Sequence, residues 1–139
     1  MIRILVYGAG PSGSLFAQPL NEARHDGAIL ARGHRLADTR AHGIIITNVT
    51  NDRTVTAAVR AVETLAPDDA YDLVLVVMRK NAALAILPGL AANRHAPNVL
   101  FLMNNAAGPG ALIEALGRER VLVGFPASAG YRDGATMHC

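Results

Sequence analysis

The chain has 139 residues, close to the usual size of one folded domain, and we expect residues 1–139 to form a single domain. Apolar residues make up 51% of it and charged residues only 17%, a balance typical of a packed globular chain and not of a disordered one. The net charge of +2 is small and scattered, with no basic run interleaved with aromatics, so the sequence does not indicate nucleic-acid binding. No segment approaches the roughly 18 apolar residues of a membrane span, and the N-terminus lacks the order of a signal peptide. We therefore expect a cytoplasmic protein.

The residues that commonly bind metals are few and badly spaced. The single cysteine, Cys139, is the last residue, which excludes an internal disulfide and a thiolate cluster. The five histidines, at positions 25, 34, 42, 95 and 138, have no metal-ligand spacing. We predict no metal site.

The first third of the chain alternates strand and helix patterns. Residues 2–7 are an apolar run typical of a buried parallel strand. A helix is predicted from about residue 11 to residue 24, with a kink or an early break at Pro19, because proline removes a helical hydrogen bond and collides with the preceding turn. A second strand is predicted over residues 28–31, followed by a short helix over residues 34–41 that stops at Gly43.

The remainder continues the alternation. Two strands rich in β-branched residues are predicted over residues 43–47 and 53–59, separated by a turn. The most hydrophobic segment, residues 72–78, should be the central strand. Pro88 and Gly89 predict two short helices within residues 81–93. The last predicted elements are a strand at 98–103, a helix at 110–116, a strand at 121–125 and a turn at 131–134. This order favours an α/β fold with a doubly wound, mostly parallel sheet and helices on both faces.

A glycine-rich segment joins the first strand to the first helix. Gly8, Gly10 and Gly13 have the spacing G-x-G-x-x-G, with Pro11 and Ser12 between the last two. In this context the first glycine allows a tight turn, the second lets a pyrophosphate approach the backbone, and the third lets helix and strand pack closely. The helix N-terminus adds free N–H groups for phosphates. The segment therefore predicts a Rossmann-like domain that binds a dinucleotide, the alternative being a turn that binds nothing.

The end of the second strand indicates which dinucleotide. NAD-binding domains usually place an acid there to hold the ribose 2′-hydroxyl, and FAD enzymes normally do so too, but here the chain continues with Arg32 and Arg35. Arginine suits a 2′-phosphate, with which it forms charge-assisted hydrogen bonds. NADP(H) is therefore favoured over NAD(H) and over a flavin. The alternative is that both arginines are solvated residues at the start of a helix.

These residues also carry a resemblance to a known family. The segments 1–13, 30–43, 71–79 and 99–124, and the A-R-G-x-R-L phrase at residues 31–36 above all, resemble the N-terminal domain of ketopantoate reductases, or 2-dehydropantoate 2-reductases. The resemblance implies a role in pantothenate biosynthesis, by hydride transfer from NADPH to a small 2-oxo acid such as 2-dehydropantoate. It also implies that Arg32 binds the 2′-phosphate.

Two further positions follow from the resemblance. The family places a cofactor-binding lysine after the central strand, where this chain has Arg79 and then Lys80. The family's Asn-Gly-x-Gly turn, whose asparagine lies near the nicotinamide and the substrate, corresponds to a turn here in which Asn105 is the candidate catalytic residue and Ala106 replaces a glycine. The alternatives are a solvated pair of cations and an ordinary turn-forming asparagine.

The resemblance covers only the first half of such enzymes. Ketopantoate reductases continue into a helical C-terminal domain that supplies a catalytic lysine and a substrate-binding glutamate, and we expect this chain to end before that domain. It is then either a piece of a longer enzyme or a stand-alone cofactor domain, inactive by itself. The other hypotheses are a non-catalytic nucleotide-binding or sensor module and a different NADP-dependent dehydrogenase. Apolar surface left exposed on such a fragment would favour a homo-oligomer.

Overall fold

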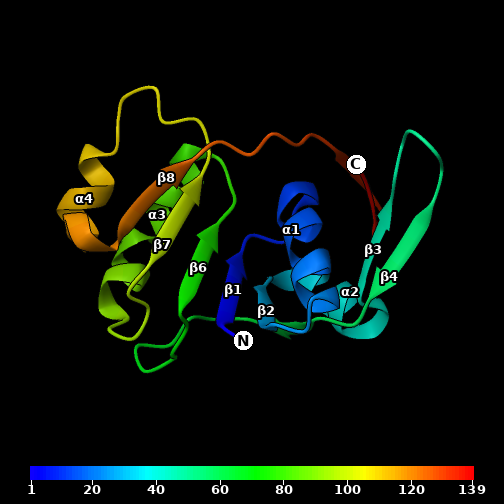
Figure 1. Ribbon diagram of the computed structural model, residues 1–139, viewed down its shortest axis with the longest axis horizontal. Coiled ribbons are helices and arrows are strands. Elements are labelled where there is room, and N and C mark those ends of the chain that lie inside the picture. Colours follow the sequence, from blue (N-terminus) through cyan, green and yellow to red (C-terminus); the bar gives the residue numbers. More distant parts are fainter.

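A computed structural model describes residues 1–139 and contains two sheets (Figure 1). The larger sheet has six strands in the order β5-β2-β1-β6-β7-β8, and every neighbouring pair is parallel. Its strands are β1 (Arg3–Tyr7), β2 (Asp26–Leu30), β5 (Arg60–Val62), β6 (Leu73–Val76), β7 (Val99–Leu102) and β8 (Val121–Gly124). The helices are α1 (Pro11–Glu22), α2 (Gly33–His42), α3 (Lys80–Ala92) and α4 (Gly110–Leu116), with a 3₁₀ turn at Arg118–Arg120. The fold class predicted from the sequence is confirmed, with β6 in the middle of the sheet.

Two separate hydrophobic clusters cover the two faces of the large sheet. Leu5, Val74 and Phe101 face the side covered by α3 and α4, and Ala83, Leu87, Leu90 and Leu112 pack against them. Ile4, Val6 and Ile29 face the other side, where Ala17 of α1 packs. Alternate residues of β1 therefore enter different clusters, as expected of a strand buried on both faces.

The smaller sheet has four strands in the order β4-β3-β10-β9. Strands β3 (Ile44–Thr47) and β4 (Thr54–Ala57) correspond to the two strands predicted on either side of a turn, and they pair antiparallel as a hairpin. Strand β10 (Thr136–His138) pairs in parallel with β3 and antiparallel with β9 (Tyr131–Asp133). Helix α1 lies between the two sheets (Figure 1), and Ile44, Ile46 and Met137 of the smaller sheet share its hydrophobic cluster.

The predicted early break at Pro19 and the predicted division of residues 81–93 into two helices are wrong. Helix α1 continues through Pro19 to Glu22, and α3 is one helix that continues through Pro88 and Gly89. Leu87 and Leu90, on either side of that pair, are buried in the same cluster. The carbonyls that lose their helical partners belong to Leu15 and Leu84, neither of which is buried, so water can satisfy them. Burial of the apolar face therefore outweighs the lost hydrogen bonds.

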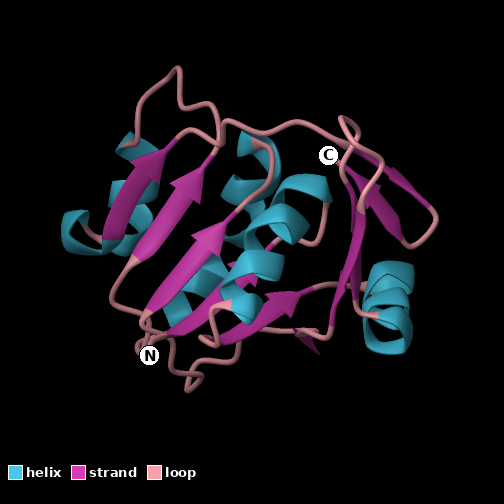
Figure 2. Cartoon of the chain, turned by 45° about the vertical axis from the view of Figure 1, so that its right-hand side comes forward, coloured by secondary structure: helices cyan, strands magenta, loops and turns pink.

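Three strands do not match the sequence prediction: β5 was not predicted, and β9 and β10 form a hairpin where only a turn was predicted. The segment after β8 crosses the carboxyl edge of the large sheet to reach that hairpin (Figure 1). Figure 2 shows the arrowheads of the parallel strands pointing to this same edge. The C-terminal hairpin therefore lies beside the glycine loop.

Strand β8 leaves apolar side chains exposed at the edge of the large sheet. Leu122, Val123 and Phe125 are 47%, 50% and 73% exposed. This matches the expectation of uncovered apolar surface, while association of copies stays a prediction. None of the helices is both long enough and apolar enough to span a bilayer.

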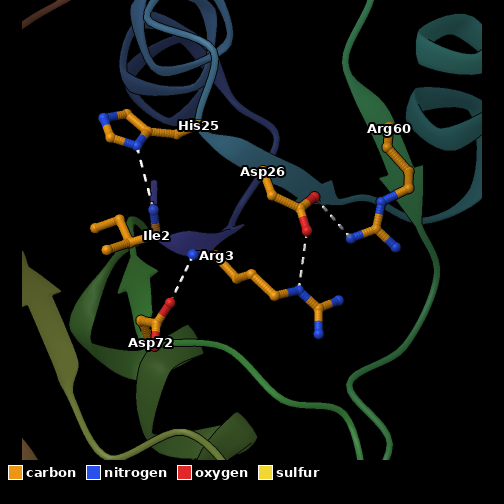
Figure 3. Close-up of polar contacts among 6 residues, drawn as sticks. All are labelled: Ile2, Arg3, His25, Asp26, Arg60 and Asp72. Carbon is orange, nitrogen blue, oxygen red and sulfur yellow. Dashed lines mark hydrogen bonds and ion pairs between the residues drawn. The ribbon is translucent and has the colours of Figure 1, made fainter.

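Polar contacts join the strands at the amino edge, away from the glycine loop (Figure 3). Asp26 accepts a hydrogen bond from Nε of Arg3 at 3.0 Å and lies 3.9 Å from Nη2 of Arg60. Asp72 accepts the backbone N–H of Arg3 at 2.7 Å. Such exposed pairs contribute little stability each, but they connect the first residues of β1, β2 and β5.

The loop that leads into β6 depends on a buried asparagine. Asn93 is fully buried; its Nδ2 donates to the carbonyls of Ala66 and Asp69 at 2.8 and 2.7 Å, and its Oδ1 accepts from the N–H of His95. We expect Asn93→Ala to lower the free energy of unfolding by about 2–3 kcal/mol, because it leaves buried groups without partners. Denaturant unfolding measures this.

The matched control is Asn98→Ala, since Asn98 is exposed and makes one side-chain hydrogen bond, to the carbonyl of Asp72. It should cost about 1 kcal/mol or less. Equal losses for the two variants would contradict the role given to Asn93.

Candidate functional site

The glycine loop is shaped by two close backbone contacts. Gly8 has φ +128°, and a Cβ there would lie 2.2 Å from the carbonyl oxygen of Val77. A Cβ on Gly13 would lie 1.8 Å from the carbonyl oxygen of Gly8. A Cβ on Gly10, in contrast, would meet nothing within 4 Å. Two glycines are thus needed for the fold, and the third keeps open space beside the first turn of α1.

Helix α1 presents its N-terminus to that open space. Gly10 is the N-cap and makes no side-chain cap, Pro11 is the first helical residue, and the first turn contains no acidic residue. The early N–H groups of a helix lack intrahelical acceptors and carry a partial positive charge. The loop therefore offers backbone donors to an anion.

Two clefts flank the loop at the carboxyl edge of the sheet, where the strand order reverses between β1 and β6. The first, which we name the β7-side cleft, has a volume of about 720 Å³ and is lined by residues that include Ser12, Arg79, Lys80, Met103, Asn104, Phe125 and Ser128. The second, the β2-side cleft, has about 660 Å³ and is lined by residues that include Tyr7, Ala31, Arg32, Arg35, Ile86 and Arg132. Both are lined by Gly8, Gly10, Pro11 and Met78, so the glycine loop divides one crevice into two compartments.

Lys80 and Asn105, both singled out from the sequence, lie in contact. The Nζ of Lys80 donates to Oδ1 of Asn105 and, at 3.4 Å, to the carbonyl of Gly108. The Nδ2 of Asn105 donates to the carbonyl of Met103 at 3.2 Å. Arg79 is exposed and lines the same cleft. Of these two cations, only Lys80 has a hydrogen bond to Asn105. The neighbouring Asn104 lines the β7-side cleft.

The two arginines after β2 differ in environment. Arg32 is exposed at the N-cap of α2, and its Nη2 donates to the hydroxyl of Tyr7 at 3.3 Å. Arg35 is only 7% exposed; its Nε donates to the carbonyl of Ala9 at 2.7 Å and its Nη2 to Oγ of Ser14 at 3.1 Å. Arg32 is therefore free to reach a ligand, whereas Arg35 holds the glycine loop and α1 against α2.

Burial lowers the pKa of Arg35, and the nearby charge of Arg132 lowers this pKa further, while Asp38 raises it. The Nη1 of Arg35 is buried without a hydrogen-bond partner. Its charge stands next to the glycine loop without an ion pair, which makes this side of the loop electropositive.

The chain after β8, which includes the hairpin of β9 and β10, supplies contacts that the sequence did not indicate. Ser128 donates from Oγ to Oγ of Ser12 at 3.1 Å, and the Sγ of Cys139 lies 3.7 Å from the carbonyl of Pro11. Burial raises the pKa of the Cys139 thiol. The signal that could have found this hairpin is Gly134 with Ala135, since a glycine in the first position of a two-residue turn is typical of hairpins.

A doubly wound parallel sheet with a glycine loop at the point where its strand order reverses defines a Rossmann-like domain. A family model described as ketopantoate reductase PanE/ApbA matches residues 4–138, and the chain therefore belongs to that family. A search of curated proteins gave no significant match.

Solved structures agree on the fold. A PanE/ApbA family ketopantoate reductase from Ralstonia eutropha JMP134 superposes with a TM-score of 0.86 at 19% identity, covering 99% of this chain and 46% of that one. A 2-dehydropantoate 2-reductase from Geobacter metallireducens GS-15 superposes with a TM-score of 0.81 at 24% identity, covering 99% of this chain and 46% of that one. The ternary structure of D-mandelate dehydrogenase with NADH and anilino(oxo)acetate superposes with a TM-score of 0.84 at 18% identity, covering 99% of this chain and 45% of that one. The chain thus spans less than half the length of these proteins.

We expect alanine substitutions at Gly13 and Gly10 to have different effects. Gly13→Ala should lower the free energy of unfolding by at least about 2 kcal/mol, because the methyl group meets the carbonyl of Gly8. Gly10→Ala should stay within about 0.5 kcal/mol of wild type, yet should weaken dinucleotide binding because its methyl group enters the open space. Thermal unfolding and nucleotide titration measure the two effects.

A Gly10→Ala variant that unfolds as easily as Gly13→Ala, or that binds nucleotide as well as wild type, would contradict this division of roles.

Proposed function

We propose that this chain is the NADPH-binding domain of a ketopantoate reductase-like oxidoreductase, which transfers hydride to the ketone of a small 2-oxo acid such as 2-dehydropantoate. The observation that carries the proposal is the end of β2. Arg32 enters the β2-side cleft there, and no aspartate or glutamate lines that cleft. A 2′-hydroxyl would find no carboxylate acceptor, whereas a 2′-phosphate would find a guanidinium.

The residues present fit a dinucleotide. The open space at Gly10 would take the pyrophosphate, whose charge the N-terminus of α1 favours. The adenosine would lie in the β2-side cleft, where Ile86 supplies an apolar wall and Arg32 a cation. The nicotinamide would lie in the β7-side cleft, beside Met103 and within reach of Arg79.

We assign Asn105 to the reacting centre, and Lys80 orients its side chain. The hydrogen bond from Lys80 holds the Asn105 amide with its Oδ1 toward the ammonium, and the Met103 carbonyl fixes the Nδ2 end. An amide held at both ends keeps one orientation, which is the requirement for a group that positions a substrate. When bound, NADPH supplies the hydride, and this chain supplies binding, orientation and charge.

Catalysis by the complete enzyme would require a second domain. The family resemblance implies that this domain provides a general-acid lysine and a substrate-binding glutamate, and this chain spans 46% of the Ralstonia eutropha structure. We propose that the chain alone binds NADPH and does not turn over 2-dehydropantoate. A cytoplasmic location and a homo-oligomeric state also stay predictions.

One alternative has support of its own. The D-mandelate dehydrogenase neighbour is described with NADH and a 2-oxo acid, so a different 2-hydroxy acid dehydrogenase remains a second candidate. A non-catalytic nucleotide sensor is a third. Cofactor preference separates the first two, since Arg32 favours NADPH.

Replacing Arg32 tests the preference directly. Wild type should bind NADPH more tightly than NADH. Arg32→Ala should weaken NADPH binding by about tenfold or more, because a charge-assisted hydrogen bond is lost, and should leave NADH binding nearly unchanged. Arg32→Glu should weaken NADPH binding further. Arg53→Ala, an exposed arginine in the β3–β4 turn, is the matched control. Fluorescence titration gives the dissociation constants, and equal binding of both cofactors by wild type would overturn the assignment.

An activity assay tests whether this chain alone catalyses the reaction. Oxidation of NADPH by 2-dehydropantoate, followed by absorbance, should be undetectable with this chain alone even at saturating cofactor. Turnover would remove the sensor hypothesis and would also show that the second domain is dispensable.

A further inference from the structure

Arg132 reaches the β2-side cleft from the far end of the chain. It lies in β9 and pairs with Met137 of β10. Paired residues of neighbouring strands project from the same face of a sheet, and Met137 is fully buried in the cluster that contains Ala17 of α1. Arg132 therefore leaves the smaller sheet on the side that faces α1, and it lines the β2-side cleft with Arg32.

Contacts on either side of Arg132 fix the position of the hairpin of β9 and β10. The rings of Tyr131 and His138 stack at 4.8 Å on the other face of the strand pair. The end of the hairpin contacts the first turn of α1, where Cys139 lies against Pro11. The position of the Arg132 backbone relative to the glycine loop is thus fixed by packing.

Arginines gather at this cleft without acidic partners. Arg32, Arg35 and Arg132 line it, and no carboxylate does. The two ion pairs of the molecule both involve Asp26, at the opposite edge, and the Nη1 of buried Arg35 has no partner. Burial lowers the pKa of Arg35, and the nearby charge of Arg132 lowers it further, with Asp38 opposing the shift. Like charges brought together in this way are stabilised by an anion.

We propose that Arg132 is a second ligand of the cofactor's 2′-phosphate, together with Arg32. This inference rests on the proposed function. The alternative phosphate is the pyrophosphate, but that group would cross the glycine loop at Gly10 and Pro11, which line both clefts, whereas Arg132 lines the β2-side cleft alone. Arg132 accordingly contributes to the choice of NADPH over NADH and contributes little to binding the rest of the dinucleotide.

The test compares Arg132→Gln with Arg118→Gln, an exposed arginine beside α4 that lines neither cleft. With NADPH as the probe, Arg132→Gln should weaken binding by about tenfold, while NADH binding changes less than about twofold. Arg118→Gln should change neither. Circular dichroism and thermal unfolding of each variant show whether the fold is retained, and Arg132→Lys, which keeps the charge, should recover part of the affinity.

A second measurement follows the phosphate itself. A phosphate monoester has a second pKa of about 6, and neighbouring guanidinium groups lower it. Phosphorus NMR of bound NADP⁺ should give a lowered pKa for the 2′-phosphate in wild type and a smaller shift in Arg132→Gln.

The outcomes separate the two claims. If wild type prefers NADPH and Arg132→Gln keeps that preference and the phosphate pKa, Arg132 is not a ligand and the proposed function stands. Equal loss of NADPH and NADH affinity also overturns the inference, since it would assign Arg132 to the pyrophosphate. If wild type does not distinguish the cofactors, both the inference and the proposed function fail.

Discussion

Helix α1 can begin directly against β1 because residues 8 and 13 carry no side chains. A Cβ on Gly13 would lie only 1.8 Å from the carbonyl oxygen of Gly8. A Cβ on Gly8 would lie 2.2 Å from the carbonyl oxygen of Val77. The first contact draws the helix onto the strand, and the second draws the loop onto the end of β6. The N-terminus of α1 is thereby aimed at the edge where the strand order reverses, which is where open α/β sheets bind ligands.

The rest of the site is built around that helix. Because α1 lies between the two sheets, the smaller sheet packs on its far side and brings the C-terminal hairpin to its first turn (Figure 1). Arg35 joins α2 to the same turn by hydrogen bonds to Ala9 and Ser14. On the other side of the loop, Lys80 and Asn105 come from the ends of neighbouring strands β6 and β7 and meet across the edge. These two backbone contacts thus position the helix around which cations from three parts of the chain, the residues after β2, the residues after β6 and strand β9, line one crevice.

The features that depend on residues close together in the sequence were predicted correctly. The glycine loop, the central position of β6 and the bounds of α4 at Gly110–Leu116 are confirmed. The continuous helix α3 was missed because local rules weigh Pro88 and Gly89 without the burial of Leu87 and Leu90. Strands β3 and β4 were predicted, but their separate sheet was missed because the pairing of β3 with β10 joins segments about ninety residues apart, which no short window contains. For the site, residue type indicated Arg32 and Arg35 alike, and only the fold distinguishes an exposed guanidinium from one buried against the glycine loop. Arg132 carries no local signal at all.

The central claim is that a dinucleotide lies across the glycine loop at the carboxyl edge of the large sheet. Backbone amide NMR of the isotope-labelled chain, recorded during addition of NADP⁺, tests it residue by residue. The largest shifts should fall on residues 8–13 and on residues 31–33, with smaller ones at Met78 and Met103 and none at the amino edge around Asp26 and Asp72. Shifts confined to another surface, or none at saturating NADP⁺, would contradict the account.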